Sequence, residues 1–299
     1  MPPITRPDPP GLTRLVEWYR GAARDLPWRR AAFHDDHGAW GTLVSEFMLQ
    51  QTPVNRVIPH LEAWLARWPT ARSLAAATPA EVLQQWANLG YPRRALWLHR
   101  AAVEITERHD GVVPRDVEAL LQLSGIGDYT ARAVAVFAYG DRHPVVDTNT
   151  RRVLARAVEG RSQPGPPSRH DLELMESLLP PSDDDAATLN AAAMELGATV
   201  CVSRAPRCER CPLVDVCAWV GDGRPDTGDT RRRQATFEGS DRQARGAALR
   251  ALRDAAPDAV PMLAVLADWP DPLQRDRALD SLIADGLAEA DGELLSLPR

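Results

Sequence analysis

The sequence predicts an all-α protein with a small mixed segment near its C-terminal end. Apolar residues recur at helical spacing in one segment after another, whereas alternating strand patterns and Asn-Gly hairpins are absent before the last part of the chain. The clearest helical runs are Leu12, Leu15, Val16 and Tyr19, then Leu43, Phe47 and Leu49, and then Ala131, Val134, Ala135 and Ala138. Proline residues between such runs, as at Pro79, Pro92 and Pro114, mark breaks in the helical pattern.

Two stretches interrupt the helical pattern more strongly. GRSQPGPPS from Gly160 predicts an internal loop, and GDGRPDTGDTRRR from Gly221 contains almost nothing that a core could bury. The second stretch predicts a domain boundary. We therefore expect a disordered segment 1–11, a main domain 12–220, a linker 221–233 and a tail 234–299.

The tail predicts the order helix, helix, hairpin. Amphipathic stretches begin at Asp241 and Gln274, and alternation around Asp291-Gly292 favours a short hairpin. This order resembles a small winged-helix unit. Four arginines of the first helix share one flank, from which they could reach phosphates together, namely Arg242, Arg245, Arg250 and Arg253. The net charge of −5 of residues 234–299 favours the alternative, in which the tail docks on the protein without contacting DNA.

The charge distribution decides which partners are compatible with the chain. The formal net charge is −6, which by itself argues against a nucleic-acid partner. Residues 234–299 contain 12 acidic residues and 7 arginines, whereas residues 1–233 contain 29 acidic residues and 28 arginines. The main body is thus nearly neutral, so that local charged faces matter more than the total. No stretch approaches the about 18 consecutive apolar residues of a membrane span, and we expect a soluble cytoplasmic protein without a membrane partner.

All four cysteines lie within 17 residues, from Cys201 through Cys208 and Cys211 to Cys217, in the spacing C-x6-C-x2-C-x5-C. Such crowding in a reducing compartment favours a metal site over disulfides. A zinc site usually has two short knuckles, whereas one short pair between two wider arms suits a [4Fe-4S] cluster. Zinc remains the alternative ligand of these cysteines.

The run Leu123-Ser124-Gly125-Ile126-Gly127 lies between two helical segments. Glycines there allow a tight turn that points N–H groups at an anion, with the positive end of the next helix behind them. The run therefore favours a phosphate clamp, although L-x-G-x-G alone also fits an ordinary turn between helices.

Two carboxylates are candidates for catalysis. Glu46 in VSEFMLQQT and Asp147 in VVDTNTRRV each lie among apolar neighbours, where a surface charge is not expected. A pair of carboxylates can divide the work of a general acid from that of stabilising a developing positive charge. Taken alone, each residue also fits a buried structural carboxylate.

Six motifs in order make the chain resemble the MutY-type adenine DNA glycosylases, a family of the helix-hairpin-helix superfamily related to endonuclease III. They are LPWR from Leu26, SEFMLQQT, WANLGY, LSGIG, VDTNTRRVLAR and the cysteine array, and the resemblance runs from about Leu12 to Cys217. It implies a six-helix barrel module and an iron-sulfur cluster module. It also implies a monomer, associated with the nucleoid, that excises adenine from mispairs with 8-oxoguanine or guanine in double-stranded DNA.

The resemblance also implies residue roles. The counterpart of Glu46 protonates adenine at N7, that of Asp147 stabilises the oxocarbenium ion, and those of Tyr129 and Asn149 order the acid, sugar and water. Tyr91 is expected to wedge beside the lesion and Gln51 to fill the vacated space. The full set expected to contact DNA or the extruded base is Trp28, Arg29, Leu49, Gln50, Gln51, Tyr91, Leu123, Gly125, Gly127, Thr130, Arg204 and Arg207.

Two departures separate this chain from relatives. Endonuclease III relatives have a catalytic lysine where Tyr129 stands, and this chain contains no lysine, so a covalent imine could form only on its α-amine. MutY enzymes usually end in a Nudix-like domain that reads 8-oxoguanine, for which residues 234–299 are too few. The alternatives are a mismatch thymine or uracil glycosylase of the same superfamily and a non-catalytic DNA-binding protein.

Overall fold

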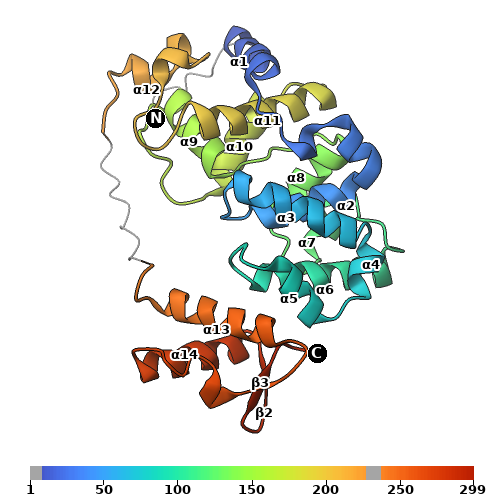
Figure 1. The fold of residues 1–299 in the computed structure, drawn as a ribbon. Coiled ribbons are helices and arrows are strands. Elements are labelled where there is room, and N and C mark those ends of the chain that lie inside the picture. Colours follow the sequence, from blue (N-terminus) through green and yellow to red (C-terminus); the bar gives the residue numbers. More distant parts are fainter. Residues whose placement is uncertain (1–8, 227–236) are drawn as a thin grey trace. The chain divides into compact units, whose positions relative to one another are not determined.

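The computed structural model describes residues 9–226 and 237–299, and nearly all of their regular structure is helical, as predicted (Figure 1). In these two ranges no helix is both long and apolar enough to cross a bilayer. The predicted disordered N-terminus lies outside the described residues up to position 8. The same holds for the predicted linker and the first residues of the tail between positions 227 and 236.

The described residues form two compact units. Unit 1 contains residues 9–39, 115–118 and 126–226, and unit 2 contains residues 40–114, 119–125 and 237–299. The helices of unit 1 are α1 (Pro9–Ala22), α8 (Asp128–Tyr139), α9 (Thr148–Ala157), α10 (Arg169–Leu178), α11 (Asp183–Thr199) and α12 (Ala218–Gly221). The helices that lie wholly in unit 2 are α3 (Val54–Arg67), α4 (Ala71–Ala75), α5 (Pro79–Trp86), α6 (Arg93–Arg108), α13 (Asp241–Ala255) and α14 (Pro272–Ala284). Two helices, α2 (Ala31–Leu49) and α7 (Val117–Leu121), have residues in both units.

The core of unit 1 forms where α1, α9, α10 and α11 pack together. Leu154 of α9, Met175 of α10 and Leu196 of α11 are buried in one apolar cluster, which Leu15 of α1 joins. The other apolar residues of the predicted first helix pack against the same cluster. The predicted loop at 160–168 is present and connects α9 to α10.

The core of unit 2 begins with the second half of α2, in which every residue from Trp40 to Met48 is buried. Gly38 has a positive φ of 51° and kinks the helix just before this half. Thr70 and Thr78 form capping boxes that begin α4 and α5. Trp64 of α3 packs edge to face on Trp68, which follows α3, and on Trp86 of α5, with ring centroids 4.7 and 5.5 Å away.

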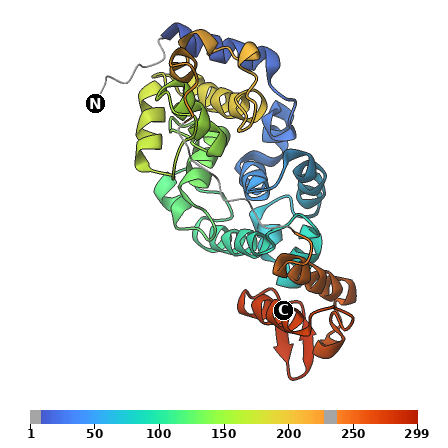
Figure 2. The same ribbon diagram turned by 90° about the vertical axis from the view of Figure 1, so that its left-hand side faces the viewer.

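The C-terminal module, which we define as residues 237–299, confirms the predicted order of helix, helix and hairpin (Figures 1 and 2). Ser240 caps α13 and Asp271 caps α14, and the two helices pack on each other. Strands β2 (Glu289–Asp291) and β3 (Leu294–Ser296) form the hairpin. Strand β1 (Val260–Pro261) pairs antiparallel with β3 and was not predicted, because two residues are too few to show an alternating pattern. The module belongs to unit 2, where α13 contacts α5.

Candidate functional site

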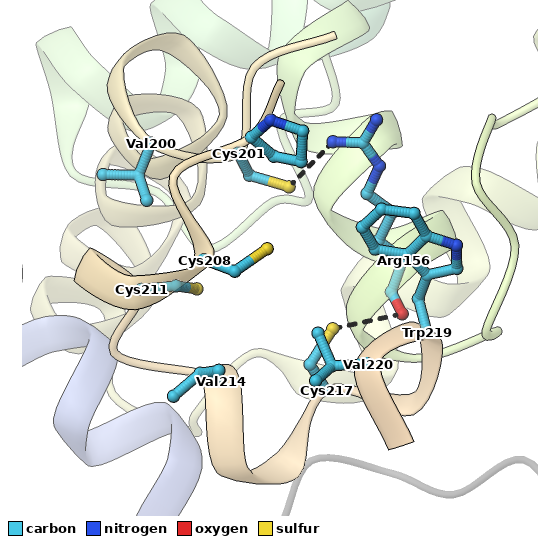
Figure 3. Close-up of a pocket in the computed structure, with 10 residues that line it drawn as sticks. Arg156, Val200, Cys201, Cys208, Cys211, Val214, Cys217, Trp219 and Val220 are labelled. Atoms are coloured by element: carbon cyan, nitrogen blue, oxygen red, sulfur yellow. Dashed lines mark hydrogen bonds between the residues drawn. The ribbon is translucent and has the colours of Figure 1, made fainter. Parts of the chain in front are cut away.

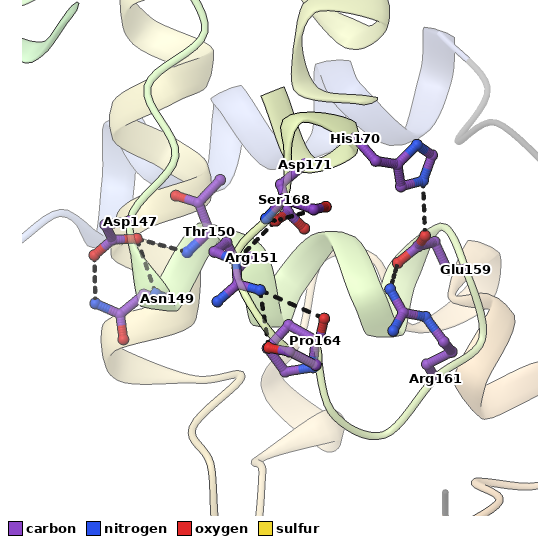
Figure 4. Close-up of polar contacts among 11 residues, drawn as sticks. Asp147, Asn149, Thr150, Arg151, Glu159, Arg161, Pro164, Ser168, His170 and Asp171 are labelled. Atoms are coloured by element: carbon purple, nitrogen blue, oxygen red, sulfur yellow. Dashed lines mark hydrogen bonds and ion pairs between the residues drawn. The ribbon is translucent and has the colours of Figure 1, made fainter. Parts of the chain in front are cut away.

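Asp147 is the N-cap of α9, and its carboxylate is held by the helix that it begins (Figure 4). One oxygen accepts hydrogen bonds from the backbone N–H groups of Asn149 at 2.9 Å and Thr150 at 2.6 Å. The other oxygen accepts from the side-chain amide of Asn149 at 2.7 Å. Three of the about four acceptor positions of a carboxylate are therefore used, and the side chain has one orientation.

Asn149 connects this carboxylate to the cysteine region. Its side-chain oxygen accepts from Nη2 of Arg152 at 2.9 Å, and Arg152 also donates to the carbonyl oxygens of Gly197 and Cys201, both at 2.6 Å. A Cβ atom on Gly197 would lie 2.6 Å from the carbonyl oxygen of Asn149, so that only glycine permits this close approach of α9 and α11. The orientation of Asp147 is thus linked through two side chains to the backbone of the first cysteine.

The four cysteines line a single pocket of unit 1 (Figure 3). The rest of its wall consists of Arg156, Trp219, Pro206 and three valines. Burial raises the pKa of Cys211 to about 12 and also raises the pKa of Cys217. Thiolates here therefore need a cationic partner, and a set of four soft sulfur donors is typical of iron-sulfur or zinc binding.

Arg156 is the buried cation of this pocket. Its Nη1 donates to Sγ of Cys201 at 3.5 Å and to the carbonyl oxygen of Val202 at 2.8 Å, and its guanidinium stacks on Trp219 at 4.9 Å (Figure 3). In the loop between Cys201 and Cys208, the side chains of Arg204 and Arg207 are exposed.

Glu46 lies in the buried half of α2 and is 5% exposed. The other buried acids of the described ranges are Asp171 and Glu195, and each is paired with arginine. Asp171 accepts from Arg151 at 3.0 Å, and this pair lies beside the loop after α9 (Figure 4). The neighbours of Glu46 along α2 are buried as well, as expected for an acid that the sequence places among apolar residues.

Glu195 of α11 is a buried acid that holds Arg24 and Arg29, a pairing that the sequence did not predict. It accepts from Arg24 at 2.7 and 2.9 Å and from Arg29 at 2.9 Å. Burial alone would raise the pKa of Glu195, but the hydrogen bonds from Arg24 and the charge of Arg29 outweigh burial and lower it. Arg29, predicted to contact the base, is thereby held in place. The sequence signal for a buried Glu195 was its position as the one acid in the mostly apolar run AAAMELGATV.

Gln51 and Tyr91, the two residues predicted to enter the base stack, share an unusual backbone conformation. Gln51 has a φ of 56° and Tyr91 a φ of 48°, and both side chains are exposed. Such positive φ values are uncommon for residues other than glycine, so the surrounding contacts must hold them. Both residues lie in unit 2, at the end of α2 and at the start of α6.

Arg94, which the sequence reasoning missed, lies between these two residues. Its Nη1 donates to the carbonyl oxygens of Phe47 at 2.8 Å and Met48 at 3.1 Å, and also to that of Gln50. Its Nη2 donates to Oγ1 of Thr52 at 2.8 Å and to the carbonyl oxygen of Gly90 at 3.0 Å. One guanidinium thus joins the end of α2 to the loop before α6.

The surroundings of Arg94 contain neutral acceptors and aromatic rings. Burial lowers the pKa of Arg94 to about 10, while its guanidinium lies over the rings of Trp86 and Tyr91 at 5.2 and 5.3 Å. The sequence did carry a signal, because two arginines begin α6, where the positive helix end disfavours cations.

The predicted hairpin connects α7 to α8 and uses its two glycines differently. Gly125 has a φ of 76°, and a Cβ there would lie 2.6 Å from Cβ of Trp97, so that a side chain is excluded. Gly127 is the exposed N-cap of α8, and a Cβ there would meet nothing within 4 Å. The backbone at Gly127 is therefore open to an anion. The side chains of Leu123 and Thr130 are buried and anchor the hairpin.

The remaining predicted residues are partly buried. Tyr129 packs against the apolar cluster of Ala133, Val136 and Val145 in unit 1, and Trp28 lies in the short 3-10 helix Pro27–Arg29. Leu49 and Gln50 lie at the end of α2 in unit 2. Unit 1 thus contains Asp147, Asn149, Tyr129 and the cysteines, whereas unit 2 contains Glu46, Gln51 and Tyr91.

Comparisons with known proteins agree with these features. The sequence model of the "HhH-GPD superfamily base excision DNA repair protein" family matches residues 44–178. The adenine DNA glycosylase of Mycolicibacterium smegmatis is 55% identical over 280 residues, which cover 93% of either chain. The adenine DNA glycosylase of Mycobacterium tuberculosis is 49% identical over 289 residues, covering 96% of this chain and 92% of that protein. The solved structure of a thermostable thymine-DNA glycosylase superposes with a TM-score of 0.64 at 25% identity, covering 71% of this chain and 95% of that one.

Proposed function

The chain belongs to the adenine DNA glycosylases of the helix-hairpin-helix superfamily, and we propose that it removes adenine mispaired with 8-oxoguanine or guanine from double-stranded DNA. The observation that carries this proposal is the 55% identity to an adenine DNA glycosylase over 93% of the chain. The similarity to the thymine-DNA glycosylase structure is lower in identity and coverage, which favours adenine as the excised base.

Glu46 is the proposed general acid. It protonates the leaving adenine at N7, so that the base departs as a neutral molecule. Its place in a fully buried stretch of α2 supports this role, because bulk water is kept from the proton that is transferred.

Asp147 is the proposed carboxylate that stabilises the oxocarbenium ion left on the sugar. Its oxygens are oriented by the backbone of α9 and by Asn149, so that little reorganisation is needed when positive charge develops. Tyr129 and Asn149 order the sugar and the attacking water beside it. Water then adds to the sugar and leaves an abasic site.

The reaction ends at base removal in this proposal. Strand cleavage by β-elimination needs an amine that forms an imine with the opened sugar, and the chain has no lysine. Arginine cannot replace it, because guanidinium stays protonated. Strand breaks should therefore appear only after alkali treatment.

Contacts with DNA are proposed for three exposed features. Tyr91 and Gln51 enter the duplex where the adenine is extruded, with Trp28, Arg29, Leu49 and Gln50 around the base. The N–H groups near Gly125 and Gly127 bind a phosphate of the backbone at the start of α8. Arg204 and Arg207 bind phosphates from the cysteine loop.

The proposed cofactor is a [4Fe-4S] cluster held by Cys201, Cys208, Cys211 and Cys217. The four thiols line one pocket, and the spacing of one short cysteine pair between two wider arms supports a cluster over zinc. Arg156 offsets the negative charge of the thiolates from its position at Cys201. When bound, the cluster supplies a structural cross-link for the loop that carries Arg204 and Arg207.

The test uses defined duplexes with adenine opposite 8-oxoguanine, guanine or cytosine, and one with a thymine mismatch, each followed by alkali. We expect excision of adenine opposite 8-oxoguanine and guanine, with little opposite cytosine. Release of thymine in preference to adenine would support the alternative mismatch glycosylase. Binding to all duplexes without any excision would support a non-catalytic DNA-binding protein.

A further inference from the structure

The loop from Ala87 to Tyr91, called here the Tyr91 loop, joins α5 to α6 in an unfavourable backbone conformation. Ala87, Gly90 and Tyr91 have φ values of 47°, 91° and 48°. Two of these three residues carry side chains that disfavour positive φ. Tyr91 itself is 51% exposed, so that its own packing cannot hold the loop. The conformation of this loop therefore depends on contacts from elsewhere in unit 2.

Side-chain donors bind each carbonyl group from Ala87 to Gly90. The carbonyl oxygen of Gly90 accepts from Trp86 at 2.9 Å and from Arg94 at 3.0 Å. The carbonyl oxygen of Leu89 accepts from Thr52 at 3.4 Å, and that of Asn88 accepts from Arg56. All of these donors belong to the helical body of unit 2, in residues 40–114.

The fourth carbonyl is bound by the C-terminal module. Arg253 of α13 donates from Nη1 to the carbonyl oxygen of Ala87, across 166 positions of sequence. Burial lowers the pKa of Arg253, with a smaller contribution from Arg250 in the same direction, which agrees with a guanidinium enclosed between α13 and the loop. The start of the Tyr91 loop is thus held by a residue that lies far away in the chain.

A second link from the module reaches the first residue of α6, just after the loop. Asp285, which follows α14, forms an ion pair with Nη1 of Arg93 at 3.1 Å and accepts a hydrogen bond from Nη2 of Arg245 at 2.7 Å. Arg93 stands two residues after Tyr91 at the start of α6. Arg245 also donates to Oγ of Ser281, so that Asp285 is oriented by the module itself. The module therefore contacts the first residue of the Tyr91 loop and the first residue of the helix that follows the loop.

These contacts change the interpretation of the arginines of α13. The expectation that four of them reach phosphates together is wrong for Arg245 and Arg253, whose guanidinium groups bind protein acceptors. Only Arg242 and Arg250 are exposed among the four. The module is thus built more for contact with the Tyr91 loop than for contact with DNA along this flank.

We propose that the C-terminal module is a positioning element for the Tyr91 loop, in which Arg253 and Asp285 set how Tyr91 enters the duplex. The inference rests on the proposed function, because it takes Tyr91 as the residue that wedges beside the mispair. The module then influences the choice of opposite base through the protein, without reading the base itself. Arg253 and Asp285 are positioning residues, since neither touches the substrate.

The test compares Arg253→Met, Asp285→Asn and their double variant with the exposed controls Arg277→Met and Asp280→Asn, all in the full-length protein. Two readouts are measured: the ratio of single-turnover adenine excision opposite 8-oxoguanine to that opposite guanine, and the fluorescence of 2-aminopurine placed beside the mispair. The fluorescence readout uses a Glu46→Gln background, so that it reports wedge insertion without turnover. Circular dichroism confirms that each variant is folded.

We expect the excision ratio and the fluorescence change to fall about tenfold in Arg253→Met, as the loss of one charge-assisted hydrogen bond predicts. The two control variants should match the wild type. In a Tyr91→Ala background, Arg253→Met should add no further effect, because the two residues act as one unit.

Three outcomes overturn the inference. The first is a folded double variant whose excision ratio and fluorescence change equal those of the wild type. The second is that Arg253→Met lowers both readouts further in the Tyr91→Ala background. The third is a lower excision ratio in Arg250→Met but not in Arg253→Met, because that result would indicate that the module contacts DNA. A wild-type protein that excises no adenine from any duplex would instead refute the proposed function, while the fluorescence arm would still report how the module affects Tyr91.

Discussion

The two units contain different arrangements of arginine. In unit 1, Arg151 pairs with the buried Asp171, and Arg24 and Arg29 pair with the buried Glu195. In unit 2, Arg94 donates five hydrogen bonds to carbonyl and hydroxyl oxygens at the base of the two inserted residues. The first arrangement depends on acidic partners, and the second depends on the fork geometry of one guanidinium.

The comparison shows two ways in which arginine stabilises a chain that contains no lysine: by pairing with buried acids, and by binding several backbone carbonyl groups at once. A guanidinium offers five donors in one plane, so that one side chain can join several segments that have no regular hydrogen bonds of their own. The acid–arginine pairs of unit 1 should therefore respond to changes of charge and pH, whereas Arg94 in unit 2, and Arg152 with its neutral acceptors in unit 1, should respond to changes of donor geometry. The following variants test this comparison.

The largest effect is expected at the acid that unit 2 contributes to the proposed reaction. Glu46→Gln keeps the volume of the side chain but removes its transferable proton, so we expect single-turnover excision to fall by about a thousandfold or more. Binding to the mispair, measured by fluorescence anisotropy, should stay near that of the wild type. The exposed Glu62→Gln on α3 is the matched control, and wild-type excision by Glu46→Gln would remove Glu46 from the mechanism.

The next effect is expected for Arg94→Lys, which keeps the charge but loses the fork. A lysine ammonium cannot reach acceptors at both the end of α2 and the Tyr91 loop, and we expect a loss of about 3 kcal/mol in the free energy of unfolding by urea. Arg100→Lys on the exposed face of α6 should cost almost nothing. Equal stability of the two variants would show that charge alone suffices at position 94.

A smaller effect is expected for Arg152→Lys in unit 1. Lysine can keep one of the three hydrogen bonds of Arg152, so that Asp147 and the backbone of Cys201 lose their common support. We expect excision to fall by about tenfold, together with a lower iron content per chain in protein purified without oxygen. Arg169→Lys, at a side chain that is 90% exposed, is the control. Unchanged excision and iron content in Arg152→Lys would show that Arg152 does not connect Asp147 to the cysteine region.

The smallest effect is expected in the pH dependence of thermal stability, to which the ion pairs of Glu195 contribute. The pKa of Glu195 is lowered in the folded state, so its contribution is fully present above the unfolded value of 4.5 and is lost as the pH falls through the folded pKa. The stability difference between wild type and Glu195→Gln should therefore shrink on acidification below pH 4.5, as thermal unfolding can measure. A difference that stays constant from pH 7 to pH 3 would contradict the pairing, and Glu209→Gln is the exposed control.

Much of the fold was predictable because it depends on short stretches of sequence. The helical spacing predicted α1, the second half of α2 and α8, and the alternation around Asp291-Gly292 predicted the hairpin. The glycine pattern predicted the turn before α8, where Gly125 has a positive φ that excludes a side chain. The cysteine spacing predicted one shared site, and the four thiols line one pocket.

What only the tertiary structure decided concerns residues that act over long distances along the chain. Arg94 binds carbonyl groups more than 40 positions away, Glu195 binds arginines more than 160 positions away, and Arg253 binds the carbonyl group of Ala87. No local pattern reports such contacts, because any of the many arginines could reach an exposed carbonyl group. Folding selects among them by burial, since a guanidinium that has lost its water must find acceptors, and only the packed helices determine which acceptors are there.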